Sequence, residues 1–427
     1  MRSRTRLLPV ALTCVALAAT AVTATAASTG TARARIAEVQ VQHDKSWRGG
    51  EPEIAINPRN PSNLVMVWAA MKQVKTPTGG TYPGLAAQFA SVGTGMQTIG
   101  CQMAYTFDAG RTWYPAPFPL GDKPACGDPM VVADSRGAFH ITYDLMGTSL
   151  TPSTEGTQPT DQVAASRSID GGRSWSDPVD VGTIVDRPFF RIDPSSDVLY
   201  EVSGGLLSAS SRKLTLSRDG GTTWSPAVAF PSDHLAVNRG LIASDLQAGN
   251  PAQLTWALSR DAGTSFVQTP VTGATAGGSG AWVSSDPTQA GHFAVMQQVG
   301  DALQVLTTSD AGRHWSAPRN LTVPGRTVSL PWLDYGPSGV LAAMWKSTGS
   351  DGTFLVYSAI LRPGAKAFSR PLRSSSVPSK GGDFVNEGAG DDLSWLTVGR
   401  SDVYLAWGDR RTGLLQAWSA RVPFGAY

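Results

Sequence analysis

Acidic side chains stand at the start of short apolar segments, where they could perform acid–base chemistry. Glu53 belongs to "EPEIAIN" (51–57), and Asp128 opens "DPMVVAD" (128–134). Glutamate is scarce, with six in the chain, yet Glu51, Glu53 and Glu387 all fall near such positions. Two carboxyl groups about 5–9.5 Å apart can catalyse glycoside hydrolysis. We therefore take Glu53 as a candidate base and Asp128 as a candidate acid.

Basic and aromatic residues occupy comparable positions along the chain. An arginine fork can bind a carboxylate through two hydrogen bonds, and a tryptophan ring can stack on a sugar face. The candidate substrate-binding residues are Arg187, Arg239, Arg326, Trp282, Trp332 and Asp391. The alternative for each of them is a polar channel lining that binds no ligand.

No cofactor is expected. The five histidines are scattered, and no His or Cys pair has the spacing of a metal site. The chain contains no phosphate-binding loop, dinucleotide fingerprint or nucleophile elbow. We expect no metal, with calcium on loop carboxylates such as Asp391 and Asp392 as the alternative.

The elements that would position these residues are revealed by a repeat. "SRDGGTTW" (217–224) has four relatives, and the aspartates of the five copies are Asp108, Asp170, Asp219, Asp261 and Asp310. Spacings of roughly 40–50 residues are typical of propellers and solenoids. Strand-like runs surround each copy, without helical periodicity. The pattern predicts an all-β propeller of four-stranded antiparallel blades, with seven blades favoured over six.

The repeated aspartate is interpreted as structural. Its carboxylate can accept backbone N–H bonds within a turn, the glycine supplies a left-handed position, and the aromatic residue packs between blades. These turns join the third and fourth strands, so they should lie on the face opposite the starts of the innermost strands. The candidate site is therefore expected at those starts, with segments 71–100 and 145–161 forming its rim.

The repeat resembles the Asp-box, or bacterial neuraminidase repeat, of the sialidase superfamily, over roughly residues 50–422. That resemblance implies an exo-sialidase-like glycoside hydrolase, in which three arginines bind the sugar carboxylate and a tyrosine is the nucleophile. Arg187, Arg239 and Arg326 would be the arginines and Tyr335 the tyrosine, with Glu53 as its base. The chain departs from the family pattern, since "EPEIAIN" lacks the arginine of the first strand and "FFRID" (189–193) echoes that motif in the third unit. The alternative is a non-catalytic propeller that binds glycan or protein.

Three parts of the chain are expected. Residues 1–26 have the cationic start, apolar run and small-residue cleavage site of a secretory signal peptide. Residues 27–50 should contain a strand, 36–42, that closes the ring as the outer strand of the last unit. Residues 51–427 form the propeller itself.

Composition bounds the partners. The chain has 35 basic and 33 acidic residues, and three of the arginines belong to the leader, so the mature protein is close to neutral. This argues against nucleic acid or a membrane surface as a partner. We expect a secreted, extracellular monomer that binds a glycan or another small-molecule or polysaccharide ligand. Cys101 and Cys126 should form a disulfide, with two buried thiols as the alternative.

Overall fold

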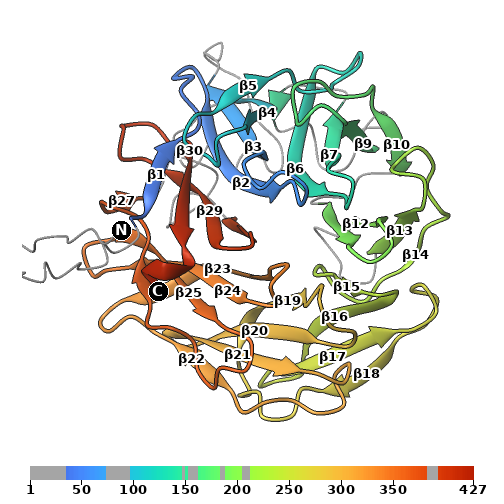
Figure 1. The fold of residues 1–427 in the computed structure, drawn as a ribbon, viewed down its shortest axis with the longest axis vertical. Helices are drawn as coiled ribbons and strands as arrows, with labels where there is room; N and C mark the ends of the chain where they lie inside the picture. The colour runs from blue at the N-terminus through green and yellow to red at the C-terminus, as the bar shows by residue number, and fades with distance from the viewer. Residues whose placement is uncertain are drawn as a thin grey trace, which may run out of the picture. The chain divides into compact units, whose positions relative to one another are not determined.

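The computed structural model describes residues 35–73, 97–146, 150–151, 162–182, 188–203, 212–381 and 393–427. Its strands form seven antiparallel sheets, each built on a path of four strands, which confirms the predicted seven-bladed propeller (Figure 1). We number the blades 1 to 7 in chain order. The signal peptide predicted for 1–26 lies outside the described residues.

Each blade runs from an innermost strand outward. The innermost strands are β2 (Arg48–Ile56), β6 (Ala125–Ala133), β11 (Phe189–Asp193), β15 (Ala236–Asn238), β19 (Ser279–Ser285), β23 (Thr327–Tyr335) and β28 (Trp395–Val398). The second strands are β3 (Leu64–Gln73), β7 (Phe139–Met146), β12 (Val198–Ser203), β16 (Leu241–Ala248), β20 (Phe293–Val299), β24 (Leu341–Thr348) and β29 (Asp402–Asp409).

The third and outer strands complete the blades. The third strands are β4 (Gln97–Thr106), β9 (Gln162–Ser168), β13 (Lys213–Ser217), β17 (Gln253–Ser259), β21 (Ala302–Thr308), β25 (Thr353–Leu361) and β30 (Gln416–Pro423). The outer strands are β5 (Tyr114–Ala116), β10 (Val179–Gly182), β14 (Val228–Ala229), β18 (Val267–Pro270), β22 (Arg319–Leu321), β26 (Leu372–Arg373) and β1 (Ala37–Gln40). Two short strands lie beside these paths, β8 (Leu150–Thr151) on β4 and β27 (Ser379–Lys380) on β25.

The ring closes through the start of the described chain. β1 pairs antiparallel with β30, with Ala37 opposite Arg421 and Gln40 opposite Trp418. Blade 7 therefore combines three strands from the end of the chain with one from its beginning, the position expected for segment 36–42. This pairing covers the edge that β30 would otherwise expose.

Blades pack on both faces because their middle strands are apolar on both. Along β24, Leu341, Ala343 and Trp345 belong to the core shared with blade 5, whereas Ala342 and Met344 belong to the core that extends to blade 7. Successive side chains of a strand point to opposite faces, so an uninterrupted apolar strand can serve two neighbours. The core is thus a series of interfaces between blades.

The repeated turns have the hydrogen bonds that the sequence predicts. In blade 2, Asp170 Oδ1 accepts bonds from Ser168 Oγ at 2.8 Å and from the backbone N–H groups of Arg173 and Ser174, both at 3.0 Å. The same pattern recurs at Asp108, Asp219, Asp261 and Asp310. These bonds hold the pKa values of Asp219 and Asp261 at about 2 despite some desolvation.

Each turn docks on the preceding blade. A Cβ at Gly312, whose φ is +89°, would lie 2.4 Å from the Trp256 ring of blade 4. A Cβ at Gly172, with φ +95°, would lie 2.5 Å from Val65 of blade 1. Only glycine combines this left-handed backbone with so close an approach. The repeat therefore joins blade to blade, which is a structural role.

Candidate functional site

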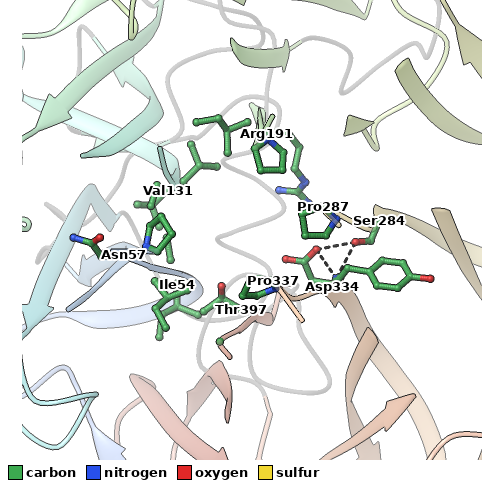
Figure 2. A pocket seen from close by; sticks show the side chains of 18 of the residues that line it. Ile54, Asn57, Val131, Arg191, Ser284, Pro287, Asp334, Pro337 and Thr397 are labelled. Carbon is green, nitrogen blue, oxygen red and sulfur yellow. Dashed lines mark hydrogen bonds between the residues drawn. The ribbon is translucent and has the colours of Figure 1, made fainter. Parts of the chain in front are cut away.

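A cavity of about 300 Å³ lies on the propeller axis, and all seven innermost strands contribute to it (Figure 2). Its walls are largely aliphatic, with Ile54, Val131 and Val237 among the lining residues. Its rim carries prolines from the turns between first and second strands, namely Pro58, Pro61, Pro194, Pro287 and Pro337. A rim of prolines is stiff because each ring fixes its own φ.

The cavity opens on the face that carries the repeated turns. Asn63 Nδ2, beside the rim of blade 1, donates a 2.9 Å hydrogen bond to Gly171 O in the turn of blade 2. The Ala311 N–H of the turn of blade 5 donates to Gly291 O, which lies between β19 and β20. The sequence predicts the site at the opposite face, where the innermost strands begin, so the described cavity lies elsewhere than predicted.

The reason is an aromatic plug at the other end of the axis, formed by Phe189, His234, Trp282, Trp332 and Trp395. The centroids of the Trp332 and Trp395 rings are 3.4 Å apart, and those of Trp282 and Trp332 are 4.4 Å apart. Among the described residues near the strand starts, the space left between Glu51, Asp128 and Trp395 is about 10 Å³. That volume holds about one water molecule.

Below the plug, charged side chains form the floor of the cavity. The Arg191 guanidinium carbon lies 5.1 Å from the Trp332 ring centroid and 4.8 Å from that of Trp395. Its Nη1 donates to Phe190 O at 2.9 Å and lies 3.9 Å from Glu53 Oε1. Arg191 is thus fixed by rings on one side and by an acid on the other.

Two carboxyl groups flank this arginine. Glu53 is 2% exposed, and burial raises its pKa well above the ordinary value, against the opposing effects of Arg191 and of a 2.8 Å hydrogen bond from Val131 N–H. Burial also raises the pKa of Asp334, again opposed by Arg191. Asp334 Oδ1 accepts bonds from Ser284 Oγ at 2.7 Å and Tyr335 N–H at 2.9 Å, as Figure 2 shows. Only Arg191 and Asp334 of this group line the axial cavity.

The predicted catalytic residues are divided between two places, since Tyr335 is among the residues that line the axial cavity, whereas Glu53 and Asp128 both border the small space beside the plug. Asp128 lies in a bulge of β6 with φ +44°, where β6 and β7 shift register, and it borders the small space beside the plug. The Tyr335 ring packs against the apolar cluster of blades 5 and 6, and burial raises its pKa. Trp332 is 1% exposed, so its ring belongs to the plug and offers no face to a sugar.

Of the three predicted substrate-binding arginines, the two that the structure describes do not meet at one site. Arg239 was placed at the start of an innermost strand, which is wrong. The innermost strand of blade 4 is β15, only three residues long, and Arg239 lies exposed in the following turn with φ +49°. Arg326 donates from Nε and Nη2 to Ser347 O and from Nη2 to Thr353 O within its own blade. Arg187 and Asp391 lie outside the described residues, as do Glu387 and Asp392.

Arg191, although it is the arginine of "FFRID", and Asp334 are not among the site residues predicted from the sequence, yet a signal for both is present. When the innermost strands are aligned, the residues two positions after the plug residues Phe189, Trp282 and Trp332 are Arg191, Ser284 and Asp334. Side chains two apart on a strand share a face, so an aromatic layer predicts that the next layer also faces the axis.

Three further findings concern a disulfide, metal ligands and membrane spans among the described residues. Cys101 and Cys126 form the predicted disulfide, with a Cα–Cα distance of 5.6 Å, between strands of blades 1 and 2. Among the described residues, no three His, Cys, Asp or Glu side chains are placed to hold a metal ion. No helix in this part of the chain is long and apolar enough to span a membrane.

Comparison with known proteins establishes the fold and nothing finer. No family model and no curated protein matches the chain. A solved protein of unknown function from Dyadobacter fermentans is similar, with a TM-score of 0.52 and 12% identity over 91% of this chain and 99% of that one. YCF48, solved with a D1 peptide, gives 0.50 and 11% over 91% and 95%. A Hadza microbial sialidase gives 0.48 and 16% over 91% and 69%.

Proposed function

We propose that the protein is an exported, monomeric and non-catalytic binding propeller, which takes the neutral sugar end of an extracellular glycan into the axial cavity. The observation that carries the proposal is the floor of that cavity, where Arg191 presents N–H donors and Asp334 presents a carboxylate oxygen between aliphatic walls. A sugar hydroxyl both donates and accepts, and the C–H faces of the ring suit aliphatic contacts.

The mixed charge of the floor favours a neutral ligand. An anion such as a sialic acid carboxylate would meet Arg191 but also Asp334, with Glu53 behind it. A cation would meet the two acids but also the arginine. Desolvating a charge is costly unless it is matched, so a polyhydroxylated neutral group satisfies both floor residues with the least penalty.

The same geometry argues against hydrolysis. Glycoside hydrolases need two groups that both reach the scissile bond. Here Asp334 borders the cavity, while Glu53 is 2% exposed and is not among the residues that line it. The phenol of Tyr335 is packed between blades. Binding is therefore the activity that the described residues support best.

The test is a titration of the purified protein with neutral monosaccharides, glucosamine and sialic acid, followed by tryptophan fluorescence and calorimetry, since Trp395 borders the cavity. We expect a neutral sugar to bind and Asp334→Asn, which preserves the bond from Ser284, to weaken it about tenfold. Arg239→Ala, an exposed arginine on the same face, is the matched control and should change nothing.

Three results would count against this function. These are no neutral sugar binding at millimolar concentration, equal affinity in Asp334→Asn, or tighter binding of sialic acid than of every neutral sugar. Hydrolysis of a chromogenic glycoside that is abolished by Glu53→Gln would restore the enzymatic alternative.

A further inference from the structure

A second cavity, of about 340 Å³, lies at the outer rim between blades 4 and 5. β17, β18 and the repeated turns of both blades line it, and its residues include Leu258, Arg260, Asp261, Val267, Thr269 and Arg313. Arg260 and Arg313 are solvent-exposed. Within the described part of the chain, their guanidinium groups have no hydrogen bond, ion pair or ring partner.

The seam between blades 1 and 2 shows what closes such a wedge. There the Arg173 guanidinium carbon lies 4.0 Å from the Phe107 ring centroid and 5.9 Å from that of Tyr105. Tyr105 stacks on Tyr114 with a centroid distance of 5.7 Å. An arginine from one turn thus covers two aromatic rings of the preceding blade, and one of those rings stacks on a third.

The repeat register gives the corresponding residues at the seam of blades 4 and 5. Leu258, Arg260, Val267 and Arg313 stand at the positions of Tyr105, Phe107, Tyr114 and Arg173. Smaller aliphatic residues and an arginine have replaced the three rings. The wedge therefore remains open, Arg313 has no ring beneath it, and Val267 is 69% exposed.

The cavity carries unbalanced positive charge. Asp261 is close by, but Ser259 Oγ donates to its Oδ1 at 2.7 Å, Ser265 N–H at 3.0 Å, and Ser265 Oγ to its Oδ2 at 2.6 Å. Those bonds occupy the carboxylate within its own turn. Two arginines then face one acid, so an acidic ligand is complementary to the cavity.

β18 adds an exposed sheet edge without charged side chains. It is the outermost strand of blade 4, and among the described residues no strand pairs with its outer side. Its sequence, Val-Gln-Thr-Pro, contains no charge, and all four residues are exposed. Extended peptides bind exposed edges by adding a strand, and here Pro270, which has no N–H, limits that pairing to the residues before it.

We propose that this rim groove, formed by Leu258, Arg260, Val267, Thr269 and Arg313, binds an extended segment of another polypeptide. The segment adds to β18, places an aromatic side chain beneath Arg313 and sets acidic side chains beside Arg260. The aromatic requirement follows from the blade 1–2 seam, and the acidic requirement from the unpaired guanidinium groups. The site is independent of the axial cavity and of any sugar bound there.

The experiment uses the fluorescently labelled peptide acetyl-Glu-Glu-Tyr-Val-Glu-Glu-amide and anisotropy at low salt. We expect it to bind, while the peptides with lysine for glutamate or alanine for tyrosine bind at least tenfold more weakly. Arg313→Ala should weaken binding about tenfold, the loss of one charge-assisted contact. Arg218→Ala, at the same turn position as Arg260 but in blade 3, is the matched control and should bind normally.

A filled groove provides the decisive variant. Arg260→Phe combined with Val267→Tyr restores two of the rings of the blade 1–2 seam, so this protein should fold with an unchanged or higher Tm and no longer bind the peptide. The proposal is overturned if the peptide fails to bind at millimolar concentration, or if the filled variant binds it equally. It is also overturned if polygalacturonate binds with the same dependence on Arg313 in place of the peptide.

Discussion

Replacing Gly312 with alanine tests whether the repeated turns join one blade to the next. The new Cβ would lie 2.4 Å from Cδ1 and from Nε1 of Trp256, a ring that is 1% exposed and cannot easily move. Overpacking of this kind costs about 1–3 kcal/mol. Displacing the ring also endangers the 3.2 Å bond from Trp256 Nε1 to Ala311 O, worth about 1 kcal/mol. The left-handed backbone adds about 1–2 kcal/mol for any residue other than glycine.

Gly300→Ala separates these contributions. Gly300 also has a positive φ, +57°, but nothing lies within 4 Å of a Cβ built on it. Both variants therefore bear the backbone cost, and only Gly312→Ala bears the contact with blade 4. Urea denaturation should show Gly312→Ala less stable than Gly300→Ala by about 2–4 kcal/mol. Equal losses in the two variants would refute the idea that the turn is held against the neighbouring blade.

Three further predictions concern other parts of the ring. Burial raises the pKa of Glu201 to about 8, so this residue should cost the wild-type protein about 1.4 kcal/mol of stability for each pH unit between the unfolded pKa and about 8. Urea titrations at several pH values should show Glu201→Gln losing stability less steeply than the wild type by about that slope. Cys101→Ser with Cys126→Ser should lower the free energy of unfolding by about 2–4 kcal/mol, and an unchanged denaturation midpoint would contradict a structural disulfide. Deleting residues 35–42 exposes the edge of β30, so size-exclusion chromatography should show larger assemblies than the undeleted protein forms.

The fold was readable from the sequence because the same local chemistry recurs. Every copy of the turn places an aspartate, a glycine and an aromatic residue where hydrogen bonding and backbone geometry demand them, and the strands between copies are short and apolar. The innermost strand of blade 4 could not be predicted from the sequence. It has only three residues and is followed by Arg239-Gly240, so the segment looks like a loop that leads into one long strand. The short length of β15 therefore caused the next strand to be taken as the innermost one, although its apolar pattern correctly indicated a strand.

The site was less readable because side-chain volume decides which end of the channel is open. Polar residues at the strand starts, such as Glu53 and Asp128, are visible in the sequence as candidates. Three tryptophans could either line the mouth of the channel or fill it, namely Trp282, Trp332 and Trp395. The outcome depends on the distance of the seven innermost strands from the axis, which the sequence of one strand does not determine. The rings meet and close one end, which leaves the small and β-branched residues of the next layer to define the cavity at the other.

Both candidate sites contain charged residues at positions where other blades carry different side chains. Equivalent positions around a ring receive the same backbone geometry, so differences in side chain alone decide what the position does. Arg191 and Asp334 are the charged members of a layer that otherwise holds small or neutral residues such as Ala55, Ser284 and Thr397. Arg260 and Val267 likewise replace two rings that fill the wedge between blades 1 and 2. In this protein, a residue that differs from its equivalents in the other blades therefore indicates a binding role better than a repeated residue does. The repeated residues hold the blades together.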